Sequence, residues 1–449
     1  MEQINLRTEG DINFSDERRI WDQQITDQQT KQILEDDARY FLHQSMSSPC
    51  LDVLESCKGS SIKTISGRQM LDFHGNNVHQ LGYGNEYILN KITEQLQSLS
   101  FSPRRYTNQP AVEFAKKIAG LLPGDLNRSL FAPGGTSAIG MAIKLARVVT
   151  GKHKLVSLWD SFHGASLDAI SAGGEAVFRK NMGPMMPGVI HIPPPTTYRG
   201  IFGDTEAGQM KYADYLEYVI AKEGDIGAFL IETIRNTDVQ IPLREYWQRI
   251  REICNRHGIL LILDEIPIAL GRTGKMFAFE HFGIEPDIIC LGKGLGGGIV
   301  PFAAMVTRDC YNIANDISLG HYTHEKSPLG SVAALATINF IEEENLLQKM
   351  NEDELFMKTQ LMQMQSTFPL IGDVRGIGLL WGIELVQDLS TKEKAINEAE
   401  KIMYECMRRG LSFKVSQGNV LQLSPALTIS REDLTNAVSI LSDVFSLIK

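Results

Sequence analysis

A lysine set among glycines is the most reactive feature of the sequence. The stretch ICLGKGLGGG, residues 289–298, places Lys293 directly after an apolar run and surrounds it with five glycines. A lysine held away from water has a lowered pKa, so its neutral amine acts as a nucleophile or forms a Schiff base. The stretch also matches G-x-G-x-x-G, but a dinucleotide site needs a helix next, and here an apolar run containing Pro301 follows. The pattern favours a loop built around a reactive amine; a lysine in a flexible loop is the alternative.

An aspartate ends a second apolar run. Asp264 follows ILLIL, residues 259–263, and a carboxylate buried there is costly unless it meets a cation or a protonated ring nitrogen. Asp264 is therefore a candidate partner for such a group, with a surface position as the alternative. For the adjacent Glu265, we expect an ordinary acid in a surface loop.

Two more stretches fit a flat, phosphorylated ligand. PGGTS, residues 133–137, precedes a helical pattern that starts near Ser137, so the backbone of Gly135 and Thr136 could bind a phosphate at the helix N-terminus. An ordinary glycine-rich turn with a Ser or Thr cap is the alternative. Phe162 and His163 follow the run KLVSLW, residues 154–159, and an aromatic ring there could stack on a ligand or pack in the core.

These four features together describe a site for pyridoxal phosphate (PLP). The lysine forms an imine with the cofactor, the aspartate keeps the pyridine nitrogen protonated, and the ring then acts as an electron sink.

The candidate residues follow separate apolar runs, which must be brought together by the fold. Ligands of open α/β sheets bind outside the carboxyl ends of the strands, so runs that end in polar or reactive groups indicate one shared edge. Short apolar runs that alternate with helical patterns predict an α/β fold with a largely parallel sheet. The runs are 129–132, 154–159, 227–232, 259–263 and 287–292, and the helical patterns are 84–99, 111–122, 137–149 and 246–258.

The C-terminal part reads as a smaller α/β domain. Residues 328–350 are expected to form one long helix, followed by strand-like pieces at 378–385 and 419–425 and helices at 394–409 and 431–448. The expected division is an N-terminal arm with a segment packing on the small domain (1–75), a large cofactor-binding domain (76–330) and a small C-terminal domain (331–449).

Composition limits the partners. The chain has 449 residues, 43% of them hydrophobic, and a formal net charge of −10, which offers no broad cationic surface for nucleic acid or an anionic membrane. The six cysteines are scattered with no metal-binding spacing, and neither a signal peptide nor a membrane span is apparent. We expect a reduced, cytoplasmic protein that has no metal site and binds neither nucleic acid nor membrane.

Three motifs carry a family resemblance over nearly the whole chain. DEIPIALGRTG (264–274), PDIICLGKGLGGGIVP (286–301) and GDVRGIGLLWGIEL (372–385) are similar to signature blocks of the class III aminotransferases, PLP-dependent enzymes of fold type I. The resemblance implies that Lys293 forms the imine and moves the proton, that Asp264 pairs with the ring nitrogen and that Phe162 stacks on the ring. It also implies that the backbone of Gly135 and Thr136 binds the cofactor phosphate.

The same resemblance implies further cofactor contacts and a dimer. Glu232 and His163 are expected beside the ring, and Thr323 is expected to reach the phosphate from a neighbouring subunit. The last role implies a homodimer with shared active sites.

Departures from the family pattern concern the reaction. Glutamate-dependent transaminases of this family hold the substrate carboxylate with an arginine, and Gln422 takes its place here. Glutamine lacks the charged, bidentate fork that a carboxylate prefers. A glutamate that gates this arginine in some members is replaced by Thr237.

The missing carboxylate clamp favours a lyase over a glutamate-dependent transaminase. The resemblance is strongest to the lyase branch, and it implies an ammonia-lyase acting on a small β-hydroxy primary amine, with a phosphonate such as 1-hydroxy-2-aminoethylphosphonate as the substrate. An ω-amine transaminase using another acceptor such as pyruvate, and a phospho-lyase of the ethanolamine phosphate type, are the alternatives. Among the loop arginines, Arg105 and Arg199 are the favoured contacts for an anionic tail.

Overall fold

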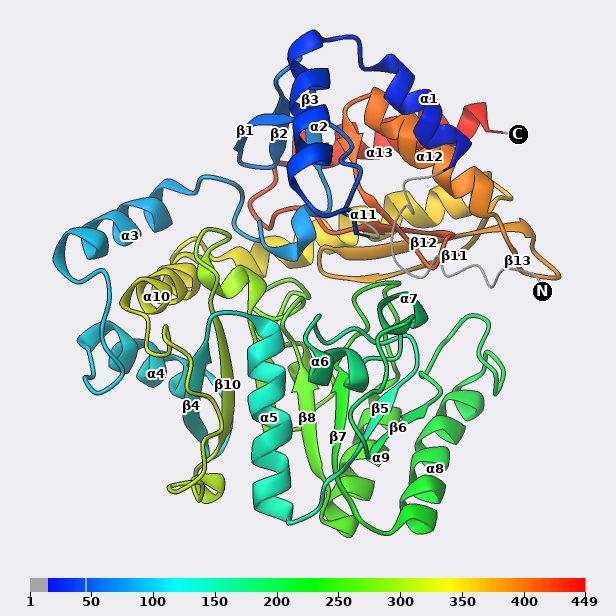
Figure 1. The fold of residues 1–449 in the computed structure, drawn as a ribbon. Coiled ribbons are helices and arrows are strands. Elements are labelled where there is room, and N and C mark those ends of the chain that lie inside the picture. Colours follow the sequence, from blue (N-terminus) through cyan, green and yellow to red (C-terminus); the bar gives the residue numbers. More distant parts are fainter. Residues whose placement is uncertain (1–14, 45–46, 449) are drawn as a thin grey trace. The chain divides into compact units, whose positions relative to one another are not determined.

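The structure is a computed structural model that describes residues 15–44 and 47–448. The chain divides into two compact units (Figure 1). The larger unit comprises residues 86–236 and 240–347. The smaller unit combines residues up to 85, residues 237–239 and residues from 348 onward.

A seven-stranded sheet forms the centre of the larger unit. Five neighbouring strands run parallel and only β10 is antiparallel to its neighbours. All five predicted runs are strands of this sheet, and the expected α/β class with a mostly parallel sheet is confirmed. The strand order is β4 (Leu126–Ala132), β10 (Ala303–Arg308), β9 (Ile288–Leu291), β8 (Leu260–Asp264), β7 (Ile226–Glu232), β5 (Lys154–Leu158) and β6 (Val189–Ile192).

The central strands are apolar on both faces because helices cover them. Helix α5 (Gly135–Thr150) buries Ile139, Ala142 and Ile143 in one core cluster, which also contains Leu230 and Ile262 from the sheet. Figure 1 shows α5 lying along the strands. Helix α9 (Arg244–His257) packs beside α8 (Glu206–Glu223) and has its own buried apolar side.

Further helices complete the larger unit. They are α3 (Glu86–Ser98), α4 (Gln109–Leu121), α6 (Leu167–Ala172), α7 (Ala176–Arg179) and α10 (Pro328–Glu343), with single 3₁₀ turns η2 (Ala278–His281), η3 (Lys293–Gly296) and η4 (Asp309–Tyr311). The prediction of one long helix over 328–350 is wrong, because α10 ends at Glu343 and α11 (Leu346–Thr367) begins after Asn345. Asn345 has a φ of 50°, a left-handed conformation that interrupts a right-handed helix.

The smaller unit joins N-terminal and C-terminal segments. A four-stranded sheet has the order β1 (Leu54–Lys58), β2 (Ser61–Thr64), β3 (Gln69–Asp72) and β14 (Leu411–Ser412), so the C-terminal β14 extends an N-terminal sheet. A second sheet has the order β11 (Ile371–Ile377), β12 (Leu380–Asp388), β16 (Val420–Leu423) and β15 (Lys414–Ser416), with β13 (Glu393–Lys394) beside β12. The helices are α1 (Asp16–Gln24), α2 (Gln28–Tyr40), α11, α12 (Ile396–Arg408) and α13 (Arg431–Leu447), with a 3₁₀ turn η1 (Gly75–Asn77).

Helix α1 packs inside this unit. Trp21 of α1 is buried, its ring lies 5.9 Å from that of Tyr404 on α12, and its indole N–H donates to the carbonyl of Leu51. Within residues 15–44 and 47–448, none of the helices has the length and apolar character needed to cross a bilayer.

Candidate active site

Two carboxylates end adjacent strands of the larger unit. Glu232 is the last residue of β7 and Asp264 the last of β8, and the two are direct partners in the parallel register. Their exposed fractions are 6% and 2%. The shared strand edge inferred from the sequence is thus occupied by a buried pair of acids.

Asp264 is fixed by two hydrogen bonds. Its Oδ2 atom lies 2.8 Å from Nδ1 of the buried His163, and its Oδ1 atom accepts from the backbone N–H of Ile266 at 3.0 Å. An ionised carboxylate only accepts, so Nδ1 of His163 carries the hydrogen. The other ring nitrogen of His163 lies 3.4 Å from the hydroxyl of Ser157. His163 therefore orients the aspartate.

Glu232 holds two backbone segments together. Its Oε1 atom accepts from the N–H of Phe162 at 3.2 Å, and its Oε2 atom accepts from the N–H of Asn236 at 3.0 Å. Burial raises the pKa of Glu232 most, and the nearby negative charge of Asp264 raises it further, while His163 acts in the opposite direction.

Lys293 follows β9 at the same edge. It opens the 3₁₀ turn η3 and has a φ of 48°, which is uncommon for a residue with a side chain and is found at sites where the surroundings enforce it. Removal from water lowers the pKa of Lys293, against the opposing influence of Asp264 and Glu232. The amine is thus available in its neutral form at a lower pH than that of an exposed lysine.

The glycine-rich turn opens helix α5. Gly134 is the N-cap and makes no side-chain hydrogen bond, so the alternative of a Ser or Thr cap does not apply. A Cβ on Gly135 would lie 2.8 Å from Cδ1 of Ile266, so a larger residue here would require the Ile266 side chain to shift. The hydroxyl of Thr136 lies 2.6 Å from that of Ser166, which fixes the first turn of the helix. Ile266, two residues after Asp264, carries no sequence signal of its own and was not predicted.

Phe162 lies in the loop that follows β5. Its ring is half-buried and lies 4.6 Å, centroid to centroid, from that of Phe178 on α7. The backbone bond to Glu232 places Phe162 next to the strand-end acids. The larger unit therefore brings together Lys293, Asp264, Glu232, Phe162 and His163.

The expectation for Glu265 is wrong. Its side chain is fully buried and accepts hydrogen bonds from the hydroxyl of Thr233 at 2.9 Å and from the N–H groups of Ala278 and Phe279 at 2.8 Å each. Burial raises the pKa of Glu265 to about 7. The chain turns back into the protein after β8, so an acid that looked like a loop residue instead anchors the start of η2.

Other predicted residues lie in loops of the larger unit. Thr323 is exposed in the segment between η4 and α10. Arg105 is exposed in the segment between α3 and α4. Arg199, between β6 and α8, is half-exposed with a φ of 74°, and its guanidinium lies 5.6 Å from the ring of Tyr198.

Gln422 and Thr237 belong to the smaller unit, where both are buried. Gln422 lies on β16 and is the direct antiparallel partner of Lys414 on β15. Removal from water lowers the pKa of Lys414 to about 7. Sequence reasoning missed this lysine, because only strand register brings position 414 beside position 422.

These residues fit PLP. The amine of Lys293 matches the aldehyde of the cofactor, and Asp264, oriented by His163, matches its ring nitrogen. The N-terminus of α5 at Gly135 matches its phosphate. No cluster of three or more potential metal-ligating side chains occurs among the residues that the structure describes.

Comparisons with known proteins agree with this chemistry. The family model for class III aminotransferases matches residues 43–445. The chain is 57% identical to (R)-1-hydroxy-2-aminoethylphosphonate ammonia-lyase of Vibrio splendidus, covering 97% of this chain and 94% of that protein. It is 36% identical to leucine/methionine racemase of Thermococcus litoralis, over 90% and 93% of the two chains.

A solved structure extends the likeness to the fold. Taurine:2-oxoglutarate aminotransferase of Bifidobacterium kashiwanohense, in complex with PLP and glutamate, superposes with a TM-score of 0.88 at 26% identity, covering 93% of this chain and 98% of that one. The fold type expected from the motifs is therefore confirmed, and so is PLP as the cofactor. The chain belongs to the class III aminotransferase family of PLP-dependent enzymes.

Proposed function

We propose that this protein is a PLP-dependent ammonia-lyase that acts on a small β-hydroxy primary amine with a phosphonate tail, such as 1-hydroxy-2-aminoethylphosphonate. The products are the corresponding aldehyde and ammonia. The observation that carries the proposal is the 57% identity, over 97% of the chain, to a lyase of that substrate. Gln422, which the family resemblance puts in place of a carboxylate-binding arginine, also supports it.

Lys293 performs the proton chemistry in this proposal. Its amine would hold the cofactor covalently until the substrate amine takes its place. The freed, neutral amine then removes a proton from the substrate carbon bearing nitrogen. PLP, when bound, supplies the electron sink that takes up the electron pair left on this carbon. The hydroxyl on the neighbouring carbon takes the proton back from Lys293 and leaves as water, and the enamine, released as Lys293 rebinds the cofactor, tautomerises and is hydrolysed by water to aldehyde and ammonia. The sequence of steps consumes no keto acid.

Asp264 keeps the electron sink effective. Its carboxylate would hold a proton at the ring nitrogen, and the hydrogen bond from His163 keeps the acid oriented. Glu232 adds a second carboxylate one strand away, and its bonds to the backbone of Phe162 and Asn236 hold the surrounding loops. Phe162 would cover one face of the ring.

Cationic side chains would bind the tail. Arg105 and Arg199 remain the candidates, and the uncharged Gln422 remains a proposed further contact of the substrate. We also propose a homodimer in which Thr323 of one subunit reaches the cofactor phosphate of the other. The exposed position of Thr323 supports this role, and the mass of the protein in solution tests the dimer.

Product analysis without an added keto acid tests the reaction. With 1-hydroxy-2-aminoethylphosphonate, the lyase should release ammonia and aldehyde over many turnovers. A single turnover that leaves pyridoxamine phosphate on the enzyme, with further turnover only on adding pyruvate, would identify an ω-amine transaminase instead. Release of inorganic phosphate from ethanolamine phosphate would identify a phospho-lyase.

A further inference from the structure

The loop that carries Phe162 is held by a segment that has no assigned role. Residues 173–179 follow α6 and include α7, and they lie against the residues that follow β5. The contacts of Gly174, Phe178 and Arg179 show how this segment is joined to the loop.

The backbone of this segment is joined to the Phe162 loop. The N–H of Gly174 donates to the carbonyl of Ser161 at 2.9 Å, directly before Phe162. A Cβ on Gly174 would lie 2.2 Å from the carbonyl oxygen of Leu158 and 2.4 Å from Cα of Trp159. Since real side chains never approach backbone this closely, only glycine permits the contact.

Aromatic packing continues the contact. The ring of Phe178 lies 4.6 Å from that of Phe162, with 44° between the ring planes. An aromatic pair at this distance is favourable and restricts how far either ring can move. Phe162 is thereby held by Phe178 at its ring and by Glu232 at its backbone N–H.

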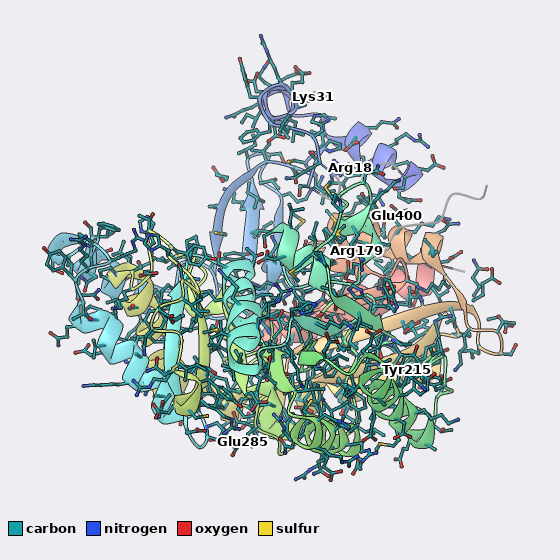
Figure 2. The ribbon with its side chains drawn as sticks, turned by 60° about the horizontal axis from the view of Figure 1, so that its bottom comes forward. Arg18, Lys31, Arg179, Tyr215, Glu285 and Glu400 are labelled. Carbon is teal, nitrogen blue, oxygen red and sulfur yellow. The ribbon has the colours of Figure 1, made fainter. Side chains whose placement is uncertain are left out.

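A second cluster anchors the end of α7. Arg179, labelled in Figure 2, donates to the carbonyl of Gly173 at 3.2 Å and lies 5.3 Å from the ring of Trp159. The same guanidinium lies 3.2 Å from Nε2 of His191, whose ring stacks on Trp159 at 4.6 Å. Burial and the adjacent Arg179 lower the pKa of His191 to about 4, so the imidazole stays neutral beside the cation.

We propose that Phe178, held in place by the anchored segment 173–179, is a positioning residue that fixes the ring of Phe162 for stacking on PLP. The inference rests on the proposed function only in that Phe162 stacks on the cofactor ring. It does not depend on which amine is turned over.

A double-mutant cycle on PLP binding tests the inference. Apoprotein would be titrated with PLP, followed by visible circular dichroism, for the wild type, Phe162→Leu, Phe178→Leu and the double variant. We expect Phe178→Leu to weaken PLP binding about 3- to 10-fold, the range of a single aromatic pair, and Phe178→Tyr, which keeps the ring, to restore it. In the Phe162→Leu background, Phe178→Leu should have no further effect, because its target ring is gone.

A matched control separates positioning from general stability. Phe202 is half-buried in the same unit and packs 4.7 Å from the ring of Tyr212, so Phe202→Leu loses a similar aromatic pair. Its PLP affinity should stay within twofold of wild type, and thermal unfolding of each apoprotein shows whether a variant is folded.

Three outcomes would overturn the inference. These are an unchanged PLP affinity in Phe178→Leu, an equal effect of Phe178→Leu with and without the ring at position 162, and a Phe162→Leu variant that binds PLP like the wild type. None of these outcomes bears on product identity, so failure of the lyase assay and failure of this inference remain distinguishable.

Discussion

Nδ1 of His163 lies 2.8 Å from Oδ2 of Asp264, and both side chains are buried. The two residues are 101 positions apart in the sequence and meet because β5 and β8 end at the same edge of the sheet. This pair sets the orientation of the acid that would face the cofactor nitrogen, and it leads to the first prediction.

Removing the imidazole should weaken catalysis without removing a reacting group. His163→Ala leaves the buried Asp264 with one hydrogen-bond donor fewer, so its carboxylate is less firmly oriented toward the cofactor nitrogen. We expect ammonia release to fall about 10- to 100-fold, a range set by the loss of one charge-assisted hydrogen bond. Ser157→Ala is the control, because the Ser157 hydroxyl lies 3.4 Å from the other ring nitrogen, a longer and weaker contact than the one to Asp264. A His163→Ala enzyme with wild-type turnover and an unchanged pH profile would contradict this assignment.

The reactivity of Lys293 should depend on its two acidic neighbours. Because Glu232 raises the pKa of Lys293, Glu232→Gln should lower that pKa further, and in the apoprotein the amine should become reactive at a lower pH. Mass spectrometry of Lys293 acetylation as a function of pH measures this shift, with the exposed Lys211 on α8 as the internal reference.

Replacing Lys293 itself should abolish its chemistry. Lys293→Ala should release ammonia at least about 10²-fold more slowly than the wild type and should form no borohydride-reducible adduct with PLP. Lys211→Ala should change neither property.

Glu265 should make stability depend on pH. Its pKa is about 7 in the folded protein, against an ordinary value of 4.5. Below about pH 4.5 the group is protonated in both the folded and the unfolded state, so it does not lower the free energy of unfolding. Between pH 4.5 and 7 it lowers the free energy of unfolding progressively. The free energy of unfolding of the wild type should therefore fall by about 3 kcal/mol relative to that of Glu265→Gln across this window. Urea unfolding at pH 4.5, 6 and 7.5 measures the difference.

Glu245→Gln is the control for this measurement, because Glu245 is exposed on α9. The free energy of unfolding of Glu245→Gln should differ from that of the wild type by the same amount over the whole pH range. A constant difference for Glu265→Gln as well would show that Glu265 does not titrate in this window.

The elements that the sequence predicted well are those with local signals. Each of the five strand runs is a short, mainly apolar segment, and the three central ones, β7, β8 and β9, are buried along their whole length. β6 was missed because it is a short edge strand with partly exposed residues. The break before α11 was missed because a single left-handed residue, Asn345, interrupts an otherwise continuous helical pattern.

The sequence by itself determined the chemical groups at the strand ends, with Lys293 and Asp264 each placed directly after an apolar run. It also determined the family, through three long motifs. Only the tertiary structure decided which groups meet: the bond of His163 to Asp264, the burial of Glu265, the packing of Phe178 on Phe162, and the pairing of Lys414 with Gln422. Local patterns report whether a segment is buried, because hydrophobic periodicity reflects burial. Contacts between distant segments depend on strand order and register, which a single sequence does not encode locally.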